Sequence, residues 1–262
     1  MSLLADLTAG AVEDAEMRRA ERPLSVVERL AEDAPTARDA VAFLSRGDTI
    51  RVIAEVKRAS PSRGDLAAIP DPAHQAALYE QGGASTISVL TEGRRFKGSL
   101  DDLSAVKARV SLPVLRKDFI ANRYQVTEAR AAGADLVLLI VSALERPVLA
   151  ELFGAITEMG MTPLVEAHSA DEVAIAADLG APIIGVNARD LSDFTLDRDL
   201  FERLRPGIPD GTIAVAESAV STPEDVVHYR RAGADVALIG EALVTGDPVS
   251  SLEAFISATE GI

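Results

Sequence analysis

Charged side chains stand where several apolar, strand-like runs of the sequence end. Glu55 and Lys57 end the first run, and Lys117, Glu166 and Glu217 end three later ones. Glu55 and Lys57 are two positions apart, so on a strand their side chains point to the same side. Ammonium and carboxylate groups that share one pocket can exchange protons with a substrate and hold its anionic groups. The pattern therefore predicts a polar site built from strand ends.

Asn187 and Arg189 follow a further run and extend the same pattern. A single lysine at such a place is often structural. A ring of two lysines, three glutamates, an asparagine and an arginine is hard to keep as inert core, because each buried charge needs a partner or a ligand. We therefore interpret the ring as a functional site.

Eight apolar runs are expected to be the strands that carry these residues. They are rich in Val, Ile and Leu and show little alternation, which is typical of parallel strands covered on both faces. The segments between them have helical patterning, and their starts carry capping residues such as Asn122 with Gln125 and Ser169 with Glu172. The expected strands are 51–57, 86–90, 114–117, 136–141, 163–166, 183–187, 213–217 and 236–239.

Strands that alternate with helices predict right-handed crossovers and a parallel sheet. Eight such units in about 210 residues fit an α/β protein with a (β/α)8 TIM barrel. Two similar segments, AAGADLVLLI at 131–140 and RAGADVALIG at 231–240, lead into the fourth and the eighth expected strands, which are half a barrel apart. A doubly wound open sheet is the alternative, but no G-x-G-x-x-G turn follows the first run. We predict the barrel over 49–262.

Residues 1–48 precede the first strand and are expected to be an N-terminal helical extension of the same domain. They have Leu, Val and Ala at helical spacing over 3–19 and roughly 24–46. We expect this extension to cover the bottom or the side of the barrel. A contribution to the mouth of the substrate site is the alternative.

In a barrel of this kind, active sites lie at the C-terminal ends of the strands, and the loops after strands seven and eight often bind phosphate. Ser218 and Ala219 stand after the seventh run, and Gly240 and Glu241 after the eighth. Ser218 can donate a hydroxyl, and Gly240 would let a phosphate approach the backbone closely. We favour phosphate binding over a simple chain turn, with Glu241 pointing away from the phosphate.

Two other polar residues of these segments are given structural roles. His168 directly precedes the helix cap at Ser169, so we interpret it as a loop residue rather than a catalyst. Arg116 neighbours Lys117 along the chain, and the alternation of a strand points it out of the barrel.

The composition excludes several classes of protein. A net charge of −15 argues against a nucleic-acid partner, and the absence of cysteine excludes disulfides and thiolate metal sites. His74, His168 and His228 are too scattered for a metal pair, so no metal is expected. The N-terminus MSLLADLTAG does not match a signal peptide, and no apolar run approaches the roughly 20 residues of a membrane span. We expect a cytoplasmic protein with no membrane partner.

Seven segments in register resemble the indole-3-glycerol phosphate synthase family: IAEVKRASPSRG, LRKDFI, GADLVLLIV, LVEAH, IGVNARDL, AVAES and GADVALIGEAL. The resemblance runs from about residue 51 to residue 243, and the extension before the first strand is also similar. It implies a (β/α)8 barrel that acts on 1-(2-carboxyphenylamino)-1-deoxyribulose 5-phosphate in tryptophan biosynthesis. Such an enzyme closes the indole ring and releases carbon dioxide and water, without a metal or organic cofactor. We expect a monomer or a weak homo-oligomer.

The resemblance also implies catalytic roles. Lys117 corresponds to the general acid at the ketone oxygen, and Lys57 to the partner of the anthranilate carboxylate, with a possible second role as an acid in the dehydration. Glu166 corresponds to the carboxylate that stabilises the cationic intermediate. Glu55 and Asn187 correspond to residues that orient the lysines and the substrate hydroxyls, and Glu217 to a further acidic residue of the pocket.

The remaining site residues are implied by the same resemblance. The expected substrate contacts are Ser60, Phe96, Phe119, Leu138, Arg189 and Leu238, and the expected phosphate contacts are Ser218, Ala219, Gly240 and Glu241. The family often has glycine where this chain has Ala219, whose methyl group would crowd a backbone phosphate site and disfavour a positive φ. It often has asparagine at Ala188, a difference to which we attach little weight.

The chemistry of the substrate agrees with these roles, because it is an anion at both ends. A lysine protonates a carbonyl near neutral pH more readily when burial or a second cation lowers its pKa. We expect Lys57 to be that second cation for Lys117. The segment SPSRG would form the first active-site loop, in which Arg63 closes over the substrate.

Two other functions fit parts of the same pattern. A lysine at a strand end of a barrel can be the nucleophile of a Schiff-base aldolase, which borohydride trapping with a ketose phosphate would reveal. A protein that binds sugar phosphates without turnover would keep the pocket and lose the reaction. The presence of both lysines and the carboxylates argues against that second alternative.

Overall fold

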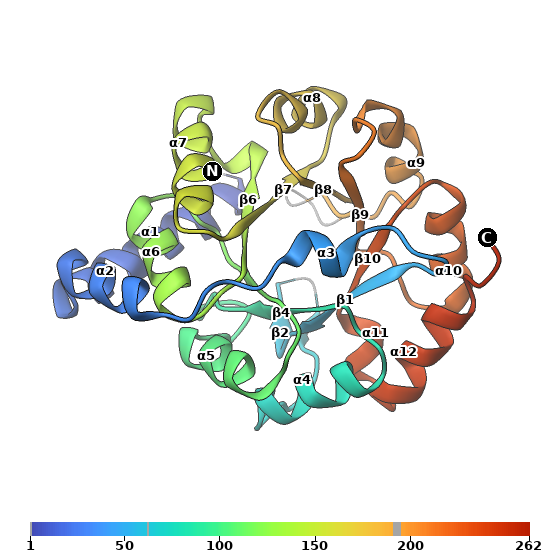
Figure 1. Ribbon diagram of the computed structural model, residues 1–262, viewed down its shortest axis with the longest axis horizontal. Coiled ribbons are helices and arrows are strands. Elements are labelled where there is room, and N and C mark those ends of the chain that lie inside the picture. Colours follow the sequence, from blue (N-terminus) through green and yellow to red (C-terminus); the bar gives the residue numbers. More distant parts are fainter. Residues whose placement is uncertain (1, 62, 191–194) are drawn as a thin grey trace.

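Eight parallel strands close into a barrel with helices around it (Figure 1). The computed structural model describes residues 2–61, 63–190 and 195–262, so Ser62 of the expected first active-site loop lies outside the described residues. The strands are β1 (Arg51–Val56), β4 (Thr86–Leu90), β5 (Val114–Lys117), β6 (Leu136–Ile140), β7 (Thr162–Ala167), β8 (Ile183–Asn187), β9 (Ile213–Glu217) and β10 (Val236–Ile239). β1 closes the barrel by pairing with β4 on one side and β10 on the other. The predicted (β/α)8 barrel is confirmed, and the open sheet is wrong.

Helices cover the outside of the barrel. They are α4 (Pro72–Gln81), α5 (Leu100–Arg109), α6 (Arg123–Ala131), α7 (Arg146–Glu158), α8 (Ala170–Asp178), α9 (Leu200–Leu204), α10 (Pro223–Arg231), α11 (Glu241–Val244) and α12 (Pro248–Ser257), with 3₁₀ turns η1 (Val141–Ala143) and η2 (Arg205–Gly207). Asn122 and Gln125 form a capping box on α6, and Ser169 caps α8, as their sequence positions predict. Gly133 and Gly233 end α6 and α10 with φ of 91° and 94°, a conformation that glycine adopts without steric cost.

Alternate residues of each strand face the helices or the barrel interior. Val52 packs in the outer cluster with the helices, whereas its neighbour Ile53 packs in the inner one. Arg116 is fully buried on the outside of β5, as its position predicts. It donates to the Gln125 carbonyl oxygen at 2.7 Å and to Asp118 Oδ2 at 3.0 Å. Lys117 therefore points into the barrel.

The N-terminal extension contains three helices, α1 (Leu3–Glu21), α2 (Leu24–Asp33) and α3 (Ala40–Leu44). The expected single helix over 24–46 is wrong, because Pro35 disfavours the helical conformation of the residue before it. Ala34 is accordingly extended, with a ψ of 140°, and the chain continues without helix to Asp39. Among the described residues, no helix is long and apolar enough to span a membrane.

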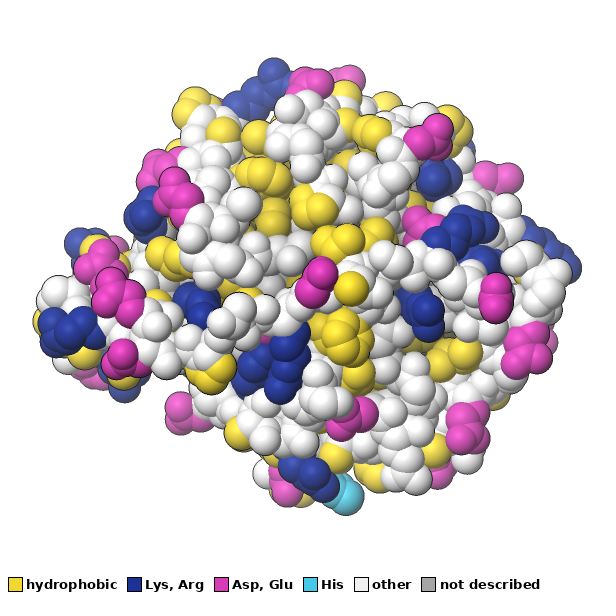
Figure 2. Space-filling model, viewed as in Figure 1, with side chains coloured by type: hydrophobic (Ala, Val, Ile, Leu, Met, Phe, Trp, Pro, Cys, Tyr) yellow, Lys and Arg dark blue, Asp and Glu magenta, His cyan; other side chains and the backbone are white. Residues whose placement is uncertain are grey.

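Residues 34–49, which we call the strap, cross the N-terminal end of the barrel (Figure 1). Ala40 and Leu44 of α3 are fully buried and pack into the inner cluster, which plugs this end. Figure 2 shows this face, where hydrophobic side chains gather near the middle. The expected cover over the bottom of the barrel is therefore supplied by the strap. Leu7 and Ala11 of α1 also belong to the inner cluster, which contains Phe119 and has Phe96 packed against it.

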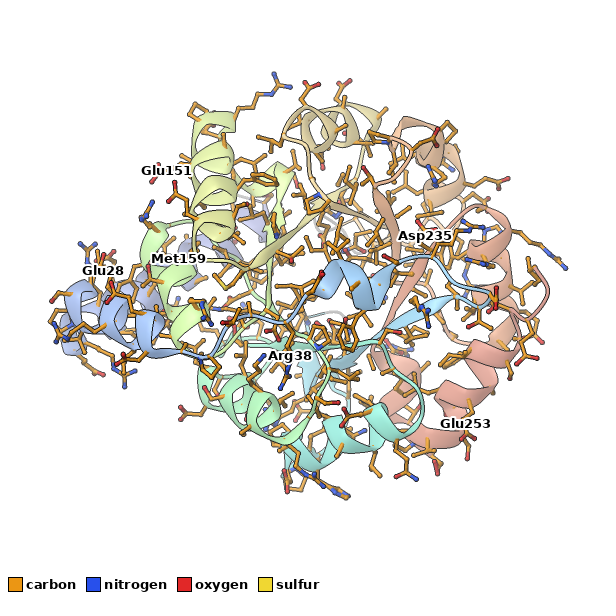
Figure 3. The ribbon with its side chains drawn as sticks, viewed as in Figure 1. Glu28, Arg38, Glu151, Met159, Asp235 and Glu253 are labelled. Atoms are coloured by element: carbon orange, nitrogen blue, oxygen red, sulfur yellow. The ribbon has the colours of Figure 1, made fainter. Side chains whose placement is uncertain are left out.

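The repeated R-x-A-G-A-D sequence fastens the strap at both ends. Arg38 N donates to Asp135 Oδ1 at 2.7 Å, and Arg46 Nη1 donates to Asp235 Oδ1 at 3.0 Å. Figure 3 labels Arg38 and Asp235 on either side of α3. The arginines that begin the two repeats act in the same way: Arg130 donates to the carbonyl oxygens of residues 34 and 35, and Arg230 to that of residue 47. Equivalent places in the two half-barrels thus hold opposite ends of one segment.

Candidate active site

The strands converge on a cavity of about 350 Å³ at their C-terminal ends. Every residue that the sequence assigned to the site lines it: Glu55, Lys57, Ser60, Phe96, Lys117, Phe119, Leu138, Glu166, Asn187, Arg189, Glu217, Ser218, Ala219, Leu238, Gly240 and Glu241. Register explains the convergence, since Asn187 lies level with Glu217 across the β8–β9 pair and Glu55 level with Ser88 across β1–β4. The C-terminal ends of the strands therefore lie at the same height in the barrel and border the same cavity.

Lys117 lies between two buried carboxylates. Its Nζ is 3.5 Å from Glu166 Oε2 and 3.8 Å from Glu217 Oε2. Burial by itself lowers the pKa of the Lys117 ammonium, but the negative charges of Glu166, Glu217 and Glu55 outweigh burial and raise this pKa above its ordinary value. The expectation of a lowered pKa is therefore not met. The site therefore keeps Lys117 as a protonated cation.

The two carboxylates beside Lys117 have opposite pKa shifts. Burial and the neighbouring negative charge of Glu166 raise the pKa of Glu217 well above its usual range. Burial acts on Glu166 in the same sense, but the positive charges of Lys117 and His168 and a hydrogen bond from Asn187 Nδ2 at 3.2 Å lower its pKa. Two carboxylates this close repel each other when both are ionised, so the pair holds one proton. Glu166 is the anion of the pair, and Glu217 is the neutral acid.

Glycine at position 185 makes room for this pair. Gly185 on β8 lies level with Glu166 on β7. A Cβ atom at position 185 would overlap Glu217 Oε1 and lie 3.2 Å from Leu164 Cδ2. Any larger residue would therefore displace the Glu217 carboxyl group from the barrel interior. The sequence contains this glycine, but its role depends on the packing of β8 against the neighbouring side chains.

Glu55 and Lys57 form the second charged pair of the site. Lys57 Nζ lies 2.7 Å from Glu55 Oε1, and Glu55 is 2% exposed. The second oxygen, Glu55 Oε2, is buried and has no hydrogen-bond partner among the described residues. Gly240 of the neighbouring β10 end borders the pair, because a Cβ atom there would lie 2.6 Å from Glu55 Oε1 and 3.1 Å from Lys57 Nζ. The glycine thus leaves space for the Glu55–Lys57 pair, a role that the sequence did not indicate.

Substituting Gly240 by alanine should therefore disturb the pair without unfolding the barrel. We expect kcat/KM to fall about 10²-fold, because a misplacement of about 1 Å in a positioned group has effects of that size. Steady-state kinetics and thermal unfolding of Gly240→Ala would check this. Gly246→Ala is the matched control, since its new Cβ atom would meet only Ser251 Oγ, at 3.7 Å. Equal activities of the two variants would contradict the prediction.

Asn187 and Ser218 connect the acidic pair to the expected phosphate loop. Ser218 Oγ donates to Asn187 Oδ1 at 2.7 Å, and the same oxygen accepts from the Arg189 backbone N–H at 3.0 Å. The Ser218 hydroxyl is therefore engaged with Asn187. Ser218 and Ala219 have φ of 67° and 62°, so this chain adopts the left-handed conformation despite the Ala219 methyl group.

Apolar residues form one wall of the cavity. The rings of Phe96 and Phe119 have their centroids 6.2 Å apart at 41°. The loop that carries Phe96 is held by Glu92, whose carboxylate accepts the backbone N–H groups of residues 94, 95 and 96. Arg94 of this loop also pairs with Glu13 and Asp14 of α1, at 2.9 and 2.7 Å. The first helix therefore supports the wall, which is the contribution to the mouth that the sequence left as an alternative.

The loop after β1 crosses the mouth of the cavity. It forms a small hairpin of β2 (Ala59–Ser60) and β3 (Gly64–Asp65), which the sequence did not predict. Arg63 of this hairpin pairs with Glu241 at the start of α11, and both residues line the cavity. Glu241 is therefore neutralised by Arg63 rather than turned away from the site.

The cavity wall also contains residues that sequence reasoning did not assign. They are Pro61, Leu90, Asp118, Ile140, Leu196, Arg198, Val220, Ser221 and Ile239. Arg198 adds a cation to the rim and pairs with Asp225 of α10. Leu196 is brought to the rim by an antiparallel bridge to Arg189. Leu90, Ile140 and Ile239 are the last residues of β4, β6 and β10, and the other six lie in loops, where no periodic pattern indicates the direction of a side chain.

His168 was interpreted as a loop residue, and it does lie just beyond the end of β7. Its side chain is nevertheless 16% exposed, and its Nε2 atom lies 3.4 Å from Glu166 Oε1. It is not among the described residues that line the cavity. The sequence signal that could have revealed this contact is the two-residue spacing from Glu166, which keeps both side chains on one side of the strand.

Comparisons with known proteins agree with this geometry. The family model for indole-3-glycerol phosphate synthase matches residues 4–255. The indole-3-glycerol phosphate synthase of Leifsonia xyli is 66% identical over 255 residues, covering 97% of this chain and 98% of the relative. Indole-3-glycerol phosphate synthase 1 of Streptomyces coelicolor is 54% identical over 261 residues, covering 99% of this chain and 97% of the relative.

Solved structures show the same fold at low identity. The N-acetylmannosamine-6-phosphate 2-epimerase of Clostridium perfringens superposes with a TM-score of 0.60 at 18% identity, covering 79% of this chain and 91% of that one. Such identity supports the barrel alone. The family model matches nearly the whole chain, and the two relatives are 66% and 54% identical to it, so these comparisons show the family as well as the fold. The chain therefore belongs to the indole-3-glycerol phosphate synthase family.

Proposed function

We propose that the chain converts 1-(2-carboxyphenylamino)-1-deoxyribulose 5-phosphate into indole-3-glycerol phosphate, carbon dioxide and water, with Lys117 as the principal general acid. The observation that carries this proposal is the position of Lys117 between Glu166 and Glu217 in a cavity that also contains Lys57. Ring closure needs a proton for the ketone oxygen as the aromatic ring attacks the ketone carbon. The Lys117 ammonium group supplies that proton.

The acidic pair then serves the later steps. Attack by the aromatic ring leaves a positively charged intermediate, and the Glu166 carboxylate stabilises that charge until carbon dioxide departs. Dehydration follows: the hydroxyl group formed from the ketone takes a proton and leaves as water, and the neighbouring CH2 carbon of the new ring loses a proton to the Glu166 carboxylate. Glu217, whose raised pKa keeps it protonated, and Lys57 are the two acids in reach of the cavity for this step.

The two anionic ends of the substrate are held by different groups of the cavity. Lys57 pairs with the anthranilate carboxylate, and the backbone around Ser218, Ala219 and Gly240 takes the phosphate, with Arg63 exchanging its contact with Glu241 for the substrate. The unpartnered Glu55 Oε2 and the Asn187 side chain accept or donate hydrogen bonds at the sugar hydroxyls. Arg189 and Ser60 contact the substrate, whose aromatic ring lies among Phe96, Phe119, Leu138 and Leu238.

The charge state of Lys117 favours this reaction over the Schiff-base alternative. An imine-forming lysine must be a neutral amine to attack a carbonyl. The carboxylates around Lys117 raise its pKa, which keeps it an ammonium ion. An ammonium ion donates protons and does not attack.

The test is a direct assay in which the fluorescence of indole-3-glycerol phosphate is followed after mixing protein and substrate. We expect turnover without added metal or cofactor, and no borohydride-trapped adduct at Lys117. Tight substrate binding without turnover would instead favour a binding protein. Neither binding nor turnover would overturn the proposed substrate.

We also propose that the protein is cytoplasmic, acts as a monomer or weak homo-oligomer and has no nucleic-acid partner. The net charge of −15 supports the last point, because polyanions are repelled by an acidic surface. We further propose that residues 1–48 belong to the same domain as the barrel over 49–262. The burial of Ala40 and Leu44 in the barrel interior supports this. Sedimentation analysis would determine the oligomeric state.

A further inference from the structure

We infer that His168, held by Glu172, is a positioning residue that fixes Glu166 as the anionic member of the acidic pair. The inference rests on the proposed function, which it deepens. It concerns the Glu166–His168–Glu172 triad, formed at the end of β7 and the start of α8.

The triad is built from two close contacts of one imidazole ring. His168 Nε2 lies 3.4 Å from Glu166 Oε1, and His168 Nδ1 lies 3.5 Å from Glu172 Oε2. Neither ring nitrogen has another partner among the described residues. The same Glu172 oxygen accepts the His168 backbone N–H at 2.8 Å, so the helix start fixes both the backbone and the ring of His168.

The surroundings of the ring favour its protonated form. Burial lowers the pKa of His168, but contact with Glu172 and the negative charges of Glu166, Glu172 and Asp190 outweigh burial and raise it. A protonated ring places a positive charge on the side of Glu166 away from Lys117. Glu166 then has cations on both sides, from β5 and β7, and an amide donor from β8.

Fewer groups stabilise a negative charge on Glu217 than on Glu166. Lys117, at 3.8 Å, is the cation that contacts it among the described residues, and its oxygens have no hydrogen-bond donor among those residues. The proton shared by the two buried carboxylates therefore resides on Glu217. Without His168, Glu166 and Glu217 would compete for the proton on more equal terms, and Glu166 would lose part of its negative charge.

Steady-state kinetics of His168→Gln give the first test. We expect kcat to fall about tenfold while KM changes less than about twofold, because Lys57 and the phosphate loop are untouched. Loss of the positive charge raises the pKa of Glu166, so the acidic limb of the kcat–pH profile should move to higher pH. Glu172→Gln should shift the limb in the same direction by less. His74→Gln, at an exposed position on α4, is the matched control and should leave kcat and the acidic limb of the pH profile unchanged.

A second test needs no substrate and leaves His168 in place. Nitrogen NMR of histidine-labelled protein should give His168 a pKa above the ordinary histidine value, and Glu166→Gln should lower it. An unchanged His168 titration in Glu166→Gln, or an unmoved pH profile in an active His168→Gln, would overturn the inference. Absence of wild-type turnover would refute the proposed function, while the NMR titration would still decide whether the two residues act on each other.

Discussion

Replacing Lys117 by alanine should lower kcat by about 10³-fold or more. General acid catalysis by one positioned group contributes about 10²- to 10⁴-fold, and this group also neutralises the carboxylates around it. Its removal would leave Glu166 and Glu217, each 1% exposed at the side chain, without their shared cation. They would retain more protons, so Glu166 would also stabilise the ring cation less. The fluorescence assay for indole-3-glycerol phosphate measures this loss.

Three comparison variants give the result a specific meaning. Lys117→Arg keeps the positive charge, but its longer, planar guanidinium group does not place an N–H where Lys117 Nζ lies, so it should not restore kcat. Lys57→Ala should mainly raise KM, because Lys57 pairs with the substrate carboxylate. Lys97→Ala, whose side chain is 55% exposed, should keep wild-type rates. A Lys117→Ala protein that is folded and within tenfold of wild type would show that the main acid is elsewhere, with Lys57 the first candidate.

Replacing Asp135 by alanine should lower the free energy of unfolding by about 3–5 kcal/mol. Asp135 is fully buried and pairs with Lys107 Nζ at 2.6 Å, and Lys107 is itself only 14% exposed at the side chain. Its carboxylate also accepts the backbone N–H groups of Arg38 and Val114, at 2.7 and 2.8 Å. The substitution would leave a largely buried cation and two N–H groups without their partner. Since native proteins are stable by about 5–15 kcal/mol, the loss is a large part of the whole.

The second copy of the same motif supplies the control. Asp235 accepts the Ala214 N–H at 3.0 Å, but its ionic partner Arg46 is 53% exposed at the side chain and can be hydrated when the carboxylate is lost. Asp235→Ala should therefore cost clearly less than Asp135→Ala in urea unfolding. Equal costs would contradict the assignment of the large effect to the Lys107 pair. Both variants should keep near-wild-type activity at low temperature, because the motif lies at the opposite end of the barrel from the site.

Much of the fold could be predicted because it depends on local sequence. Apolar runs indicate buried parallel strands, and Asn122 and Ser169 cap helices where the chain turns. In parallel strands, all carboxyl ends meet at one end of the barrel. The strand-end position of Lys117 and Glu166 therefore predicted their meeting before any geometry was known. The break between α2 and α3 also had a local signal in Pro35, which the helical spacing of apolar residues obscured.

The remaining features depend on distances between strands, which a single sequence does not contain. Gly185 matters because the Glu217 side chain lies over it, and that follows from how β8 packs against its neighbours. The raised pKa of Lys117 depends on how many carboxylates lie within a few ångströms of it, not on their presence in the chain. His168 contacts Glu166 because Glu172 holds its ring at the start of α8.

The strap has a consequence for folding kinetics. Its fastening bonds join residues 95 to 97 positions apart at one end and 183 or 189 apart at the other. Contacts across such separations carry a loop-closure cost that local contacts avoid, so we expect them to form after the half-barrels that provide Asp135 and Asp235. Weakening the strap therefore accelerates unfolding and leaves the folding rate nearly unchanged. The strap is synthesised before the barrel, and we expect it to be fixed in place after the barrel.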